Sequence, residues 1–389
     1  KAVSLSGTDI TGTWNPFSLI PVTATLAELT TQLIAPFYKL PISPVLAGKL
    51  PFIIMSLILP FLISGIAFEF TKDRNVSIWA WIFSMFNPWI WQLGRMSFDP
   101  YASFFFYIFG AYLLLKLKNW QKLWSILPFF VGFYQYQGHK LIFPFWIIFF
   151  FLYSVSPSLH PYSSFRKLIT KLKRQKNKPQ VAVLAVTALL FAFYVLVQLP
   201  QHKSSDRLNT LFLPNSSEVV REVNELRRLS LDSPLNSKII NKYSIWAGIV
   251  FRRFTQTYSF EFLFLEGQVS NAVWSVWNHG IFYIADSVLI ILGFAYLLSK
   301  KRYKFIAFLC LGLVLFVFTS LISSNEAYFF RSSLNIPLLI VLAAVGFEYA
   351  RLSLPKIFVY LFIGYYLINI LHFGYLYFIR YPIIAADRQ

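Results

Sequence analysis

Eight ionisable side chains that could carry acid–base or phosphate chemistry stand at the ends of apolar stretches far apart in the chain. They are Asp9, Glu28, Arg95, Asp99, His139, Lys140, Glu326 and Arg331. A carboxylate can act as a general base, and Arg and Lys hold phosphate charge. We predict that they meet at one face of the molecule.

Such a set suits sugar transfer from a lipid phosphate. The phosphate is already a good leaving group, so the site needs cations rather than a general acid. We assign this phosphate-binding role to Lys140, Arg331, His139 and Arg95. A carboxylate then takes the proton of the acceptor as it attacks the anomeric carbon, in a single inverting displacement. The candidates are Asp9 and Asp99, with Glu28 and Glu326 as further possibilities, and a groove between apolar helices would hold the lipid tail.

Each of these residues also has a purely structural explanation. Asp99 precedes Pro100, so it can simply complement a helix start. Lys140 and Arg331 can be snorkelling side chains at a membrane interface. Asp9 and Glu28 can be ordinary loop residues, and a lone histidine is a weak signal. Convergence of the whole set would favour a site over these separate explanations.

The composition predicts an integral membrane protein. Hydrophobic residues make up 57% of the 389 positions and charged residues 13%, about half the usual fraction of a soluble domain. A helix that crosses the hydrocarbon needs ~20 mostly apolar residues. Ten stretches qualify, at roughly 45–69, 75–93, 101–116, 123–137, 139–156, 180–199, 281–298, 304–322, 334–350 and 356–379. The expected fold is an all-α polytopic bundle of about ten spans.

Two stretches do not fit a bilayer and complete the predicted organisation. Residues 1–44 form a first extracytoplasmic loop with membrane-surface segments, and 200–280 form a large extracytoplasmic loop. Spans one to six occupy 45–199, and spans seven to ten with an outer C-terminus occupy 281–389. Within the large loop we expect an amphipathic helix capped by Asn215 with Glu218. Its apolar stripe is Val219, Val220, Val223, Leu226 and Leu229.

Basic residues orient the predicted bundle. Alternate loops carry Lys72 and Arg74, then Lys116 to Lys122, the run 166–178, the run 300–304, and finally Arg351 and Lys356. The positive-inside rule makes these loops cytoplasmic. The net charge of +19 is then mostly a topology signal that meets anionic membrane lipid, and we expect no nucleic-acid partner. The eight candidate residues fall on the other, outer side.

Several features limit the possible chemistry. The chain has no HExxH pair, Walker loop, Gly-rich dinucleotide turn or Cys cluster. Metal dependence stays open, because one Glu and one His make no ligand set, although a divalent cation is an option. Cys310 is the single cysteine, so no intramolecular disulfide can form. The chain begins with Lys1, and we expect that an N-terminal piece precedes it.

The order and spacing of several motifs resemble the GT-C membrane glycosyltransferases. The similarity is to bacterial relatives of dolichyl-phosphate-mannose–protein mannosyltransferases and of lipid A aminoarabinose transferases, and it covers most of the chain. The motifs are SGTDITGTWNPFSL, AELTTQLIAPFYKLP, GRMSFDPYASFFFYIFGAYLL, YQYQGHKLIFPFW, FEFLFLEGQ with GIFYIADSVLIILG, and FFRSSLNIPLLIVLAAVG. The resemblance implies a polyprenyl-phosphate sugar donor, a lipid, polysaccharide or protein acceptor, and a bacterial plasma membrane with the site on its outer face.

Carried over by residue, the resemblance makes Asp99 the family's second outer-face acid. It places Lys140 and Arg331 near the lipid phosphate, and Glu28 at a metal-binding acid of the aminoarabinose branch. The family usually opens with a span followed by an Asp-Glu pair that supplies the favoured base. Neither precedes Asp9 here, so either they belong to the missing piece, which would make eleven spans, or Asp9 serves.

Other functional classes remain open at this point. A transporter or lipid flippase would carry internal repeats and charges at mid-membrane, and the chain shows no clear repeat and few such charges. A polymerase or ligase of surface polysaccharide shares the lipid-linked donor but has a different architecture. A non-catalytic scaffold is a further alternative.

Overall fold

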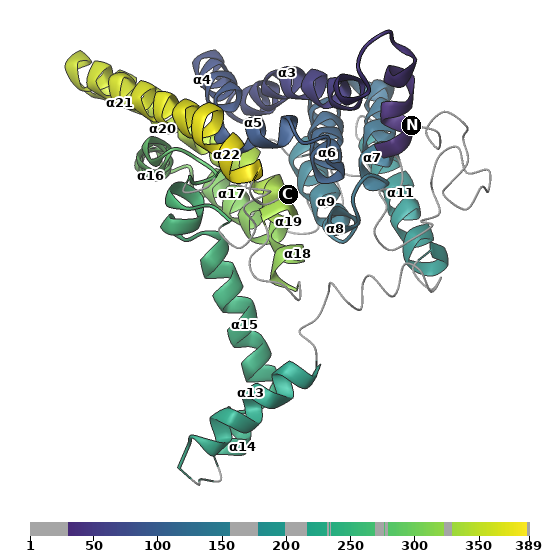
Figure 1. The fold of residues 1–389 in the computed structure, drawn as a ribbon, viewed down its shortest axis with the longest axis vertical. Coiled ribbons are helices and arrows are strands. Elements are labelled where there is room, and N and C mark those ends of the chain that lie inside the picture. Colours follow the sequence, from purple (N-terminus) through teal and green to yellow (C-terminus); the bar gives the residue numbers. More distant parts are fainter. Residues whose placement is uncertain are drawn as a thin grey trace.

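The computed structural model describes residues 30–155, 178–198, 216–231, 233, 235–268, 276, 279–322 and 329–386. Every regular element in this part of the chain is a helix, as Figure 1 shows. The predicted all-α class is confirmed.

The first half of the described chain builds one group of helices. Its α-helices are α2 (Thr30–Ile34), α3 (Pro44–Thr71), α4 (Arg74–Met85), α5 (Pro88–Gly94), α6 (Asp99–Lys116), α7 (Ile126–Phe133), α8 (Gln137–Lys140), α9 (Phe143–Val155) and α11 (Lys178–Phe193). Two short 3₁₀ helices, η1 (Ala35–Lys39) and η2 (Asn119–Ser125), and a π-helical turn, η4 (Tyr194–Gln198), adjoin them.

The second half adds a projecting hairpin and the remaining helices. The α-helices are α13 (Ser216–Arg228), α14 (Asn236–Ile239), α15 (Lys242–Thr257), α16 (Ile284–Ser299), α17 (Tyr303–Phe316), α18 (Phe318–Leu321), α19 (Phe329–Ser332), α20 (Ile336–Ser353), α21 (Lys356–Tyr375) and α22 (Tyr381–Ala386). The π-helical turns η5 (Glu261–Leu265) and η7 (Leu376–Arg380) and the 3₁₀ turn η6 (Ser333–Asn335) connect them.

Long apolar helices indicate a membrane-embedded protein. Four of the described helical segments have the length and composition to cross a bilayer: Pro44–Thr71, Lys178–Gln198, Phe329–Ser353 and Lys356–Ile383. The pair α5 and α6, bent by 119° at their junction, would make a fifth. All ten apolar stretches identified in the sequence contain helix, but several are short or broken. About ten spans are therefore not confirmed.

Helix α20 occupies the centre of the bundle and crosses α16 at backbone contact. A Cβ atom added to Gly346 would lie 1.9 Å from the Leu289 carbonyl oxygen, and one added to Gly293 would lie 2.2 Å from the Leu342 carbonyl oxygen. Small residues allow this approach, which is typical of helix packing in membranes. The whole apolar part of α20 is buried as a result.

A sharp break between α5 and α6 interrupts the apolar stretch. Asn87 caps α5, with its side-chain oxygen accepting from the Ile90 amide at 3.1 Å, and Pro88 follows at the first helical position. Ser97 then adopts a left-handed φ of 51°, and Asp99 begins α6. The N-cap residue is Phe98, so Asp99 complements the helix dipole from the first turn instead of capping the helix with its side chain.

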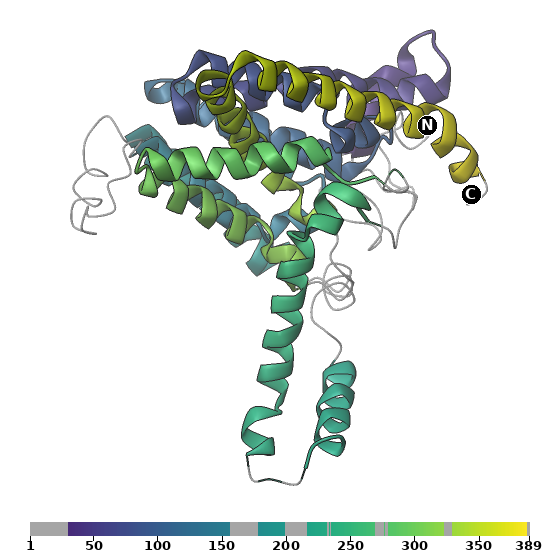
Figure 2. The same ribbon diagram turned by 90° about the vertical axis from the view of Figure 1, so that its left-hand side faces the viewer.

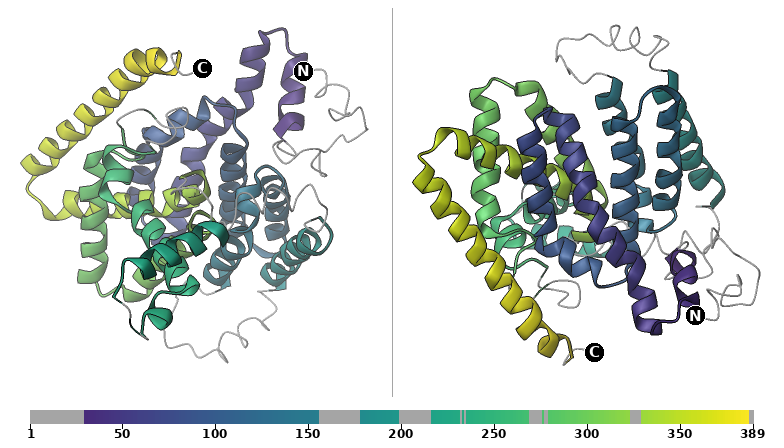
Figure 3. Two further views of the ribbon diagram at one scale, coloured as in Figure 1. Left: turned by 60° about the horizontal axis from the view of Figure 1, so that its bottom comes forward. Right: turned by 90° about the horizontal axis from the view of Figure 1, so that it is seen from above.

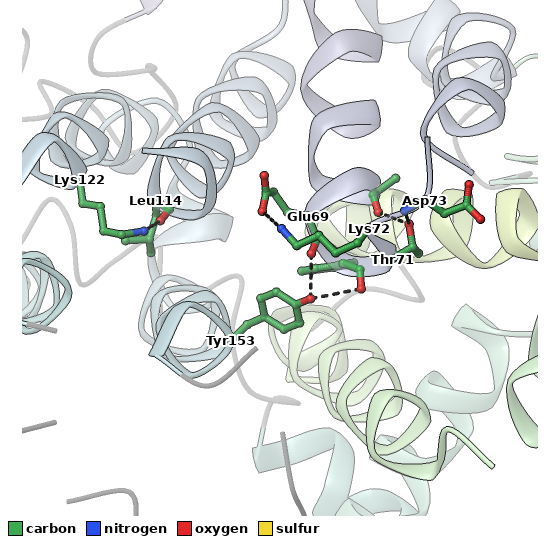
Figure 4. Close-up of polar contacts among 9 residues, drawn as sticks. Glu69, Thr71, Lys72, Asp73, Leu114, Lys122 and Tyr153 are labelled. Carbon is green, nitrogen blue, oxygen red and sulfur yellow. Dashed lines mark hydrogen bonds and ion pairs between the residues drawn. The ribbon is translucent and has the colours of Figure 1, made fainter. Parts of the chain in front are cut away.

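Basic loops that are distant in sequence lie at one end of the bundle. The Nζ atoms of Lys72 and Lys116 lie 5.7 and 6.0 Å from the centroid of the Phe68 ring at the end of α3. Lys72 also pairs with Glu69, as Figure 4 shows. Lys122 donates to a carbonyl near the end of α6 (Figure 4). The first two of the basic loops predicted to share one side of the membrane thus lie close together, whereas most of the run 166–178 lies outside the described residues.

The end of α20 joins this region through one carboxylate. Glu348 accepts from Arg351 Nε at 2.8 Å and Nη2 at 2.6 Å. The same carboxylate accepts from Asn75 Nδ2 at 3.2 Å and Trp79 Nε1 at 3.1 Å, both on α4. In the right-hand view of Figure 3, α2 and α22 lie at the opposite end of the bundle. The side of the membrane that each end faces stays a prediction.

Part of the predicted 200–280 loop forms a helical hairpin that projects from the bundle (Figure 2). The amphipathic helix expected there is α13, and it packs along α15. Only Val219 and Val223 of its apolar stripe are buried, whereas Val220, Leu226 and Leu229 are exposed. The packed helix therefore uses a narrower apolar face than the sequence pattern predicts, and Asn215 lies outside the described residues.

The Gly346→Ala substitution should destabilise the bundle, because its methyl group would overlap the Leu289 carbonyl. Overpacking of this kind costs about 1–3 kcal/mol or more. We expect a lower thermal midpoint in detergent, measured by intrinsic fluorescence. Gly364→Ala on α21 is the matched control, since a Cβ there has no atom within 4 Å. Equal midpoints for the two variants would contradict the importance of this crossing.

Candidate functional site

His139 is the centre of a buried polar cluster between α6, α8 and α19. Its side chain is fully buried. Nδ1 lies 2.8 Å from the Ser103 hydroxyl on α6, and Nε2 lies 2.9 Å from the Phe330 carbonyl oxygen on α19. The Ser333 hydroxyl lies 3.3 Å from the same nitrogen. One imidazole therefore ties together three segments that are far apart in the chain.

The hydrogen-bond partners restrict the role of each ring nitrogen. A carbonyl can only accept, so Nε2 carries a proton and donates it to the Phe330 carbonyl oxygen. The Ser103 hydroxyl beside Nδ1 also donates to the Gly132 carbonyl oxygen at 2.9 Å, which extends the cluster to α7. His139 is a positioning residue in this arrangement.

Lys140 is held in a cage of aromatic rings. Its Nζ lies 5.4 Å from the ring centroid of Phe133, 5.0 Å from that of Tyr134 and 4.8 Å from that of Tyr194. The side chain is 1% exposed. Ring faces attract a cation electrostatically, and the attraction strengthens when water is excluded. Such a cage stabilises a positive charge inside an apolar bundle.

Arg331 and Asp99 approach the same cluster from α19 and α6. Arg331 is buried and follows directly after Phe330, whose carbonyl binds His139. The Phe330 ring packs against that of Phe98, with 5.2 Å between centroids, immediately before Asp99. Asp99 is half-buried, one helical turn before Ser103. The structure thus brings α8, α19 and the start of α6 together at His139, whereas the Lys140 ammonium lies among rings of α7 and η4.

Arg95 lies elsewhere, because α5 has two different faces. On one face the Trp89 ring packs on Phe329, with 5.2 Å between centroids. On the other face the Arg95 guanidinium lies over the rings of Tyr377 and Tyr381, at 5.1 and 4.8 Å. The predicted grouping of Arg95 with the other basic residues is thus not seen, since the bend after α5 directs it away from α8.

Three of the predicted site residues cannot be placed. Asp9, Glu28 and Glu326 lie outside the described residues. Within the described part of the chain, no group of three or more His, Cys, Asp or Glu side chains is arranged to hold a metal ion. The roles predicted for these acids and for a divalent cation therefore stay predictions.

Polar residues that sequence reasoning did not select complete the cluster. Ser103 and Ser333 bind His139, and Asn335 is buried with no hydrogen bond to its side-chain amide within the described chain. Ser103 follows Asp99 by four residues, a spacing that puts both on one helix face. That spacing was available in the sequence as a signal. Asn335 has no comparable local pattern.

The segments that meet at His139 carry buried cations and polar groups. Lys140 and Arg331 are buried, and the Asn335 side-chain amide is buried without a hydrogen-bond partner within the described chain. Charge-assisted hydrogen bonds to an anionic group are strong in a water-poor region. In comparisons with protein-family models, curated proteins and solved structures, nothing matches this chain.

The His139→Phe substitution should destabilise the protein, because it removes the hydrogen bonds to Ser103 and to the Phe330 carbonyl from a buried region. Each such bond contributes about 0.5–1.5 kcal/mol. We expect a lower thermal midpoint in detergent for this variant than for wild type.

The exposed His372→Gln variant serves as the control for this measurement and should keep the wild-type midpoint. Equal midpoints for wild type and His139→Phe would show that His139 does not hold the three segments together.

Proposed function

We propose that this protein is a membrane glycosyltransferase that moves a sugar from a polyprenyl-phosphate donor to an acceptor on the non-cytoplasmic face. The observation that carries the proposal is that α8, α19 and the start of α6 meet at His139, since these segments hold Lys140, Arg331 and Asp99. Lipid, polysaccharide and protein are all candidate acceptors.

In the proposed reaction, basic side chains hold the donor phosphate and a carboxylate accepts a proton. Arg331 and Lys140 bind the phosphate oxygens as negative charge grows on them. The acceptor oxygen bonds to the anomeric carbon while the bond from that carbon to the phosphate oxygen breaks. The acceptor proton passes to Asp99, or to Asp9 if that residue is the base. The products are the glycosylated acceptor, inverted at the anomeric carbon, and polyprenyl phosphate.

We further propose that the chain is a GT-C relative with about ten spans in a bacterial plasma membrane. The motif order in the sequence supports this proposal. The shorter apolar helices Phe143–Val155, Ile284–Ser299 and Tyr303–Phe316, which are additional to the four or five candidate spans, also support it. In this proposal the hydrogen bonds of His139 keep α19 next to α6. Arg331 on α19 and Asp99 on α6 would then face the same bound donor.

Asp99→Asn and Arg331→Gln should each abolish most transfer without unfolding the protein. Loss of a general base costs about 10²–10⁴-fold in rate, and loss of a preorganised charge-stabilising group costs about 10²–10³-fold. The assay follows label from radiolabelled polyprenyl-phosphate sugars to a membrane extract, with purified full-length protein in nanodiscs.

Lys118→Gln, an exposed cation after α6, is the matched control and should keep wild-type activity. Undiminished transfer by Asp99→Asn would leave that residue as a helix-dipole partner only. Absence of transfer by wild type across a broad donor panel would overturn the transferase proposal and favour a transporter or scaffold.

A further inference from the structure

An apolar cavity of about 340 Å³ lies between α3, α5 and η7, on the face of α5 turned away from His139. It is lined by Lys49, Ile53, Ser56, Leu57, Met85, Ile90, Trp91, Gly94, Arg95, Tyr377 and Phe378. At its base α5 approaches α3 closely. A Cβ atom added to Gly94 would lie only 2.1 Å from Ser56 Oγ. Ser56 in turn hydrogen-bonds the Tyr101 hydroxyl at 2.8 Å.

Two cations line this apolar space. Lys49 and Arg95 are both half-buried, and the lining includes no carboxylate among the described residues. The Arg95 guanidinium lies over the rings of Tyr377 and Tyr381, at 5.1 and 4.8 Å from their centroids. A guanidinium fork of this kind suits phosphate oxygens. The charge of the cavity is therefore complementary to an anionic head group, and its walls are complementary to a hydrocarbon chain.

The outer wall of the cavity belongs to a loosely packed part of the fold. The apolar window of the α21 span is only 11% buried inside the protein, compared with 100% for α20. Leu57, Trp91 and Phe378 on the cavity rim are exposed. In a membrane such side chains contact lipid, and an apolar void of this size does not hold water well. A lipid chain would supply the missing packing.

We propose that this cavity binds an anionic phospholipid, with one acyl chain between α3 and η7 and its phosphate between Lys49 and Arg95. This site is separate from the His139 cluster, and the proposal does not depend on transferase activity. The bound lipid joins the weakly packed end of α21 to the rest of the bundle. Because it binds only the folded protein, it also raises stability.

The test measures lipid retention and stability in purified full-length protein. After delipidation, phosphatidylglycerol, phosphatidylcholine or polyprenyl phosphate is added, and native mass spectrometry counts the bound lipids while fluorescence follows unfolding. Wild type should retain phosphatidylglycerol and gain thermal stability from it. The double variant Lys49→Gln/Arg95→Gln should bind it about tenfold more weakly, as expected for loss of charge-assisted hydrogen bonds.

The control removes the same charge from the projecting hairpin, as Lys238→Gln/Lys242→Gln, where both side chains are exposed. It should bind phosphatidylglycerol as wild type does. A second variant, Leu57→Trp, keeps both cations but fills the cavity, so it should also lose the lipid. It replaces the double variant as the test if the double variant fails to fold.

Three outcomes would overturn the proposal. They are equal retention of phosphatidylglycerol by wild type and both cavity variants, equal retention of the two phospholipids, and exclusive binding of polyprenyl phosphate at this place. The last outcome would make the cavity part of a donor site. Loss of transferase activity is not among the readouts, so failure of the proposed function would leave this test intact.

Discussion

The close crossing of α16 and α20 is the constraint on which the rest of the structure depends. Gly293 and Gly346 let the two backbones approach until any added side chain would overlap a carbonyl oxygen. Without a hydrophobic driving force between helices in a bilayer, such close van der Waals packing provides much of the association energy. It places α20 at the centre, where other helices bury its apolar part. The segment leading into α20 is held with it.

That leading segment carries the polar chemistry into the bundle. Phe330 presents its carbonyl to His139 and its ring to Phe98, so α19 is fixed against both α8 and α6. Burial of polar groups is costly unless they are hydrogen-bonded, and the ring nitrogens of His139 meet that requirement with Ser103 and the Phe330 carbonyl. The histidine thus connects α6, α8 and α19 through these hydrogen bonds.

Helix α5 divides two environments that share the same end of the bundle. Trp89 of α5 packs on the aromatic side chains before α20, and Arg95, which follows the helix directly, lies over Tyr377 of η7 and Tyr381 of α22. The bend of 119° between α5 and α6 makes this division possible, because a straight helix would continue the direction of α5. One short helix thus separates the segment before α20 from the cavity beside η7.

Composition and apolar patterning alone determined the membrane setting, the all-α class and the location of the helical stretches. These properties follow from the bilayer, which demands apolar side chains and internally satisfied backbone groups over each span. The pattern also predicted that Asp99, His139, Lys140 and Arg331 lie at one face of the molecule, since they stand at the ends of apolar stretches. Local spacing could further have suggested Ser103.

Only the tertiary structure decided which of those residues meet. The break at Ser97 and the crossing at Gly346 depend on contacts between segments that are distant in the chain, and no local pattern encodes them. For the same reason Arg95, only four residues from Asp99, lies on the opposite face of α5 from the cluster. Hydropathy reports how much a residue prefers lipid, but the direction in which a polar side chain points is set by the packing of its helix.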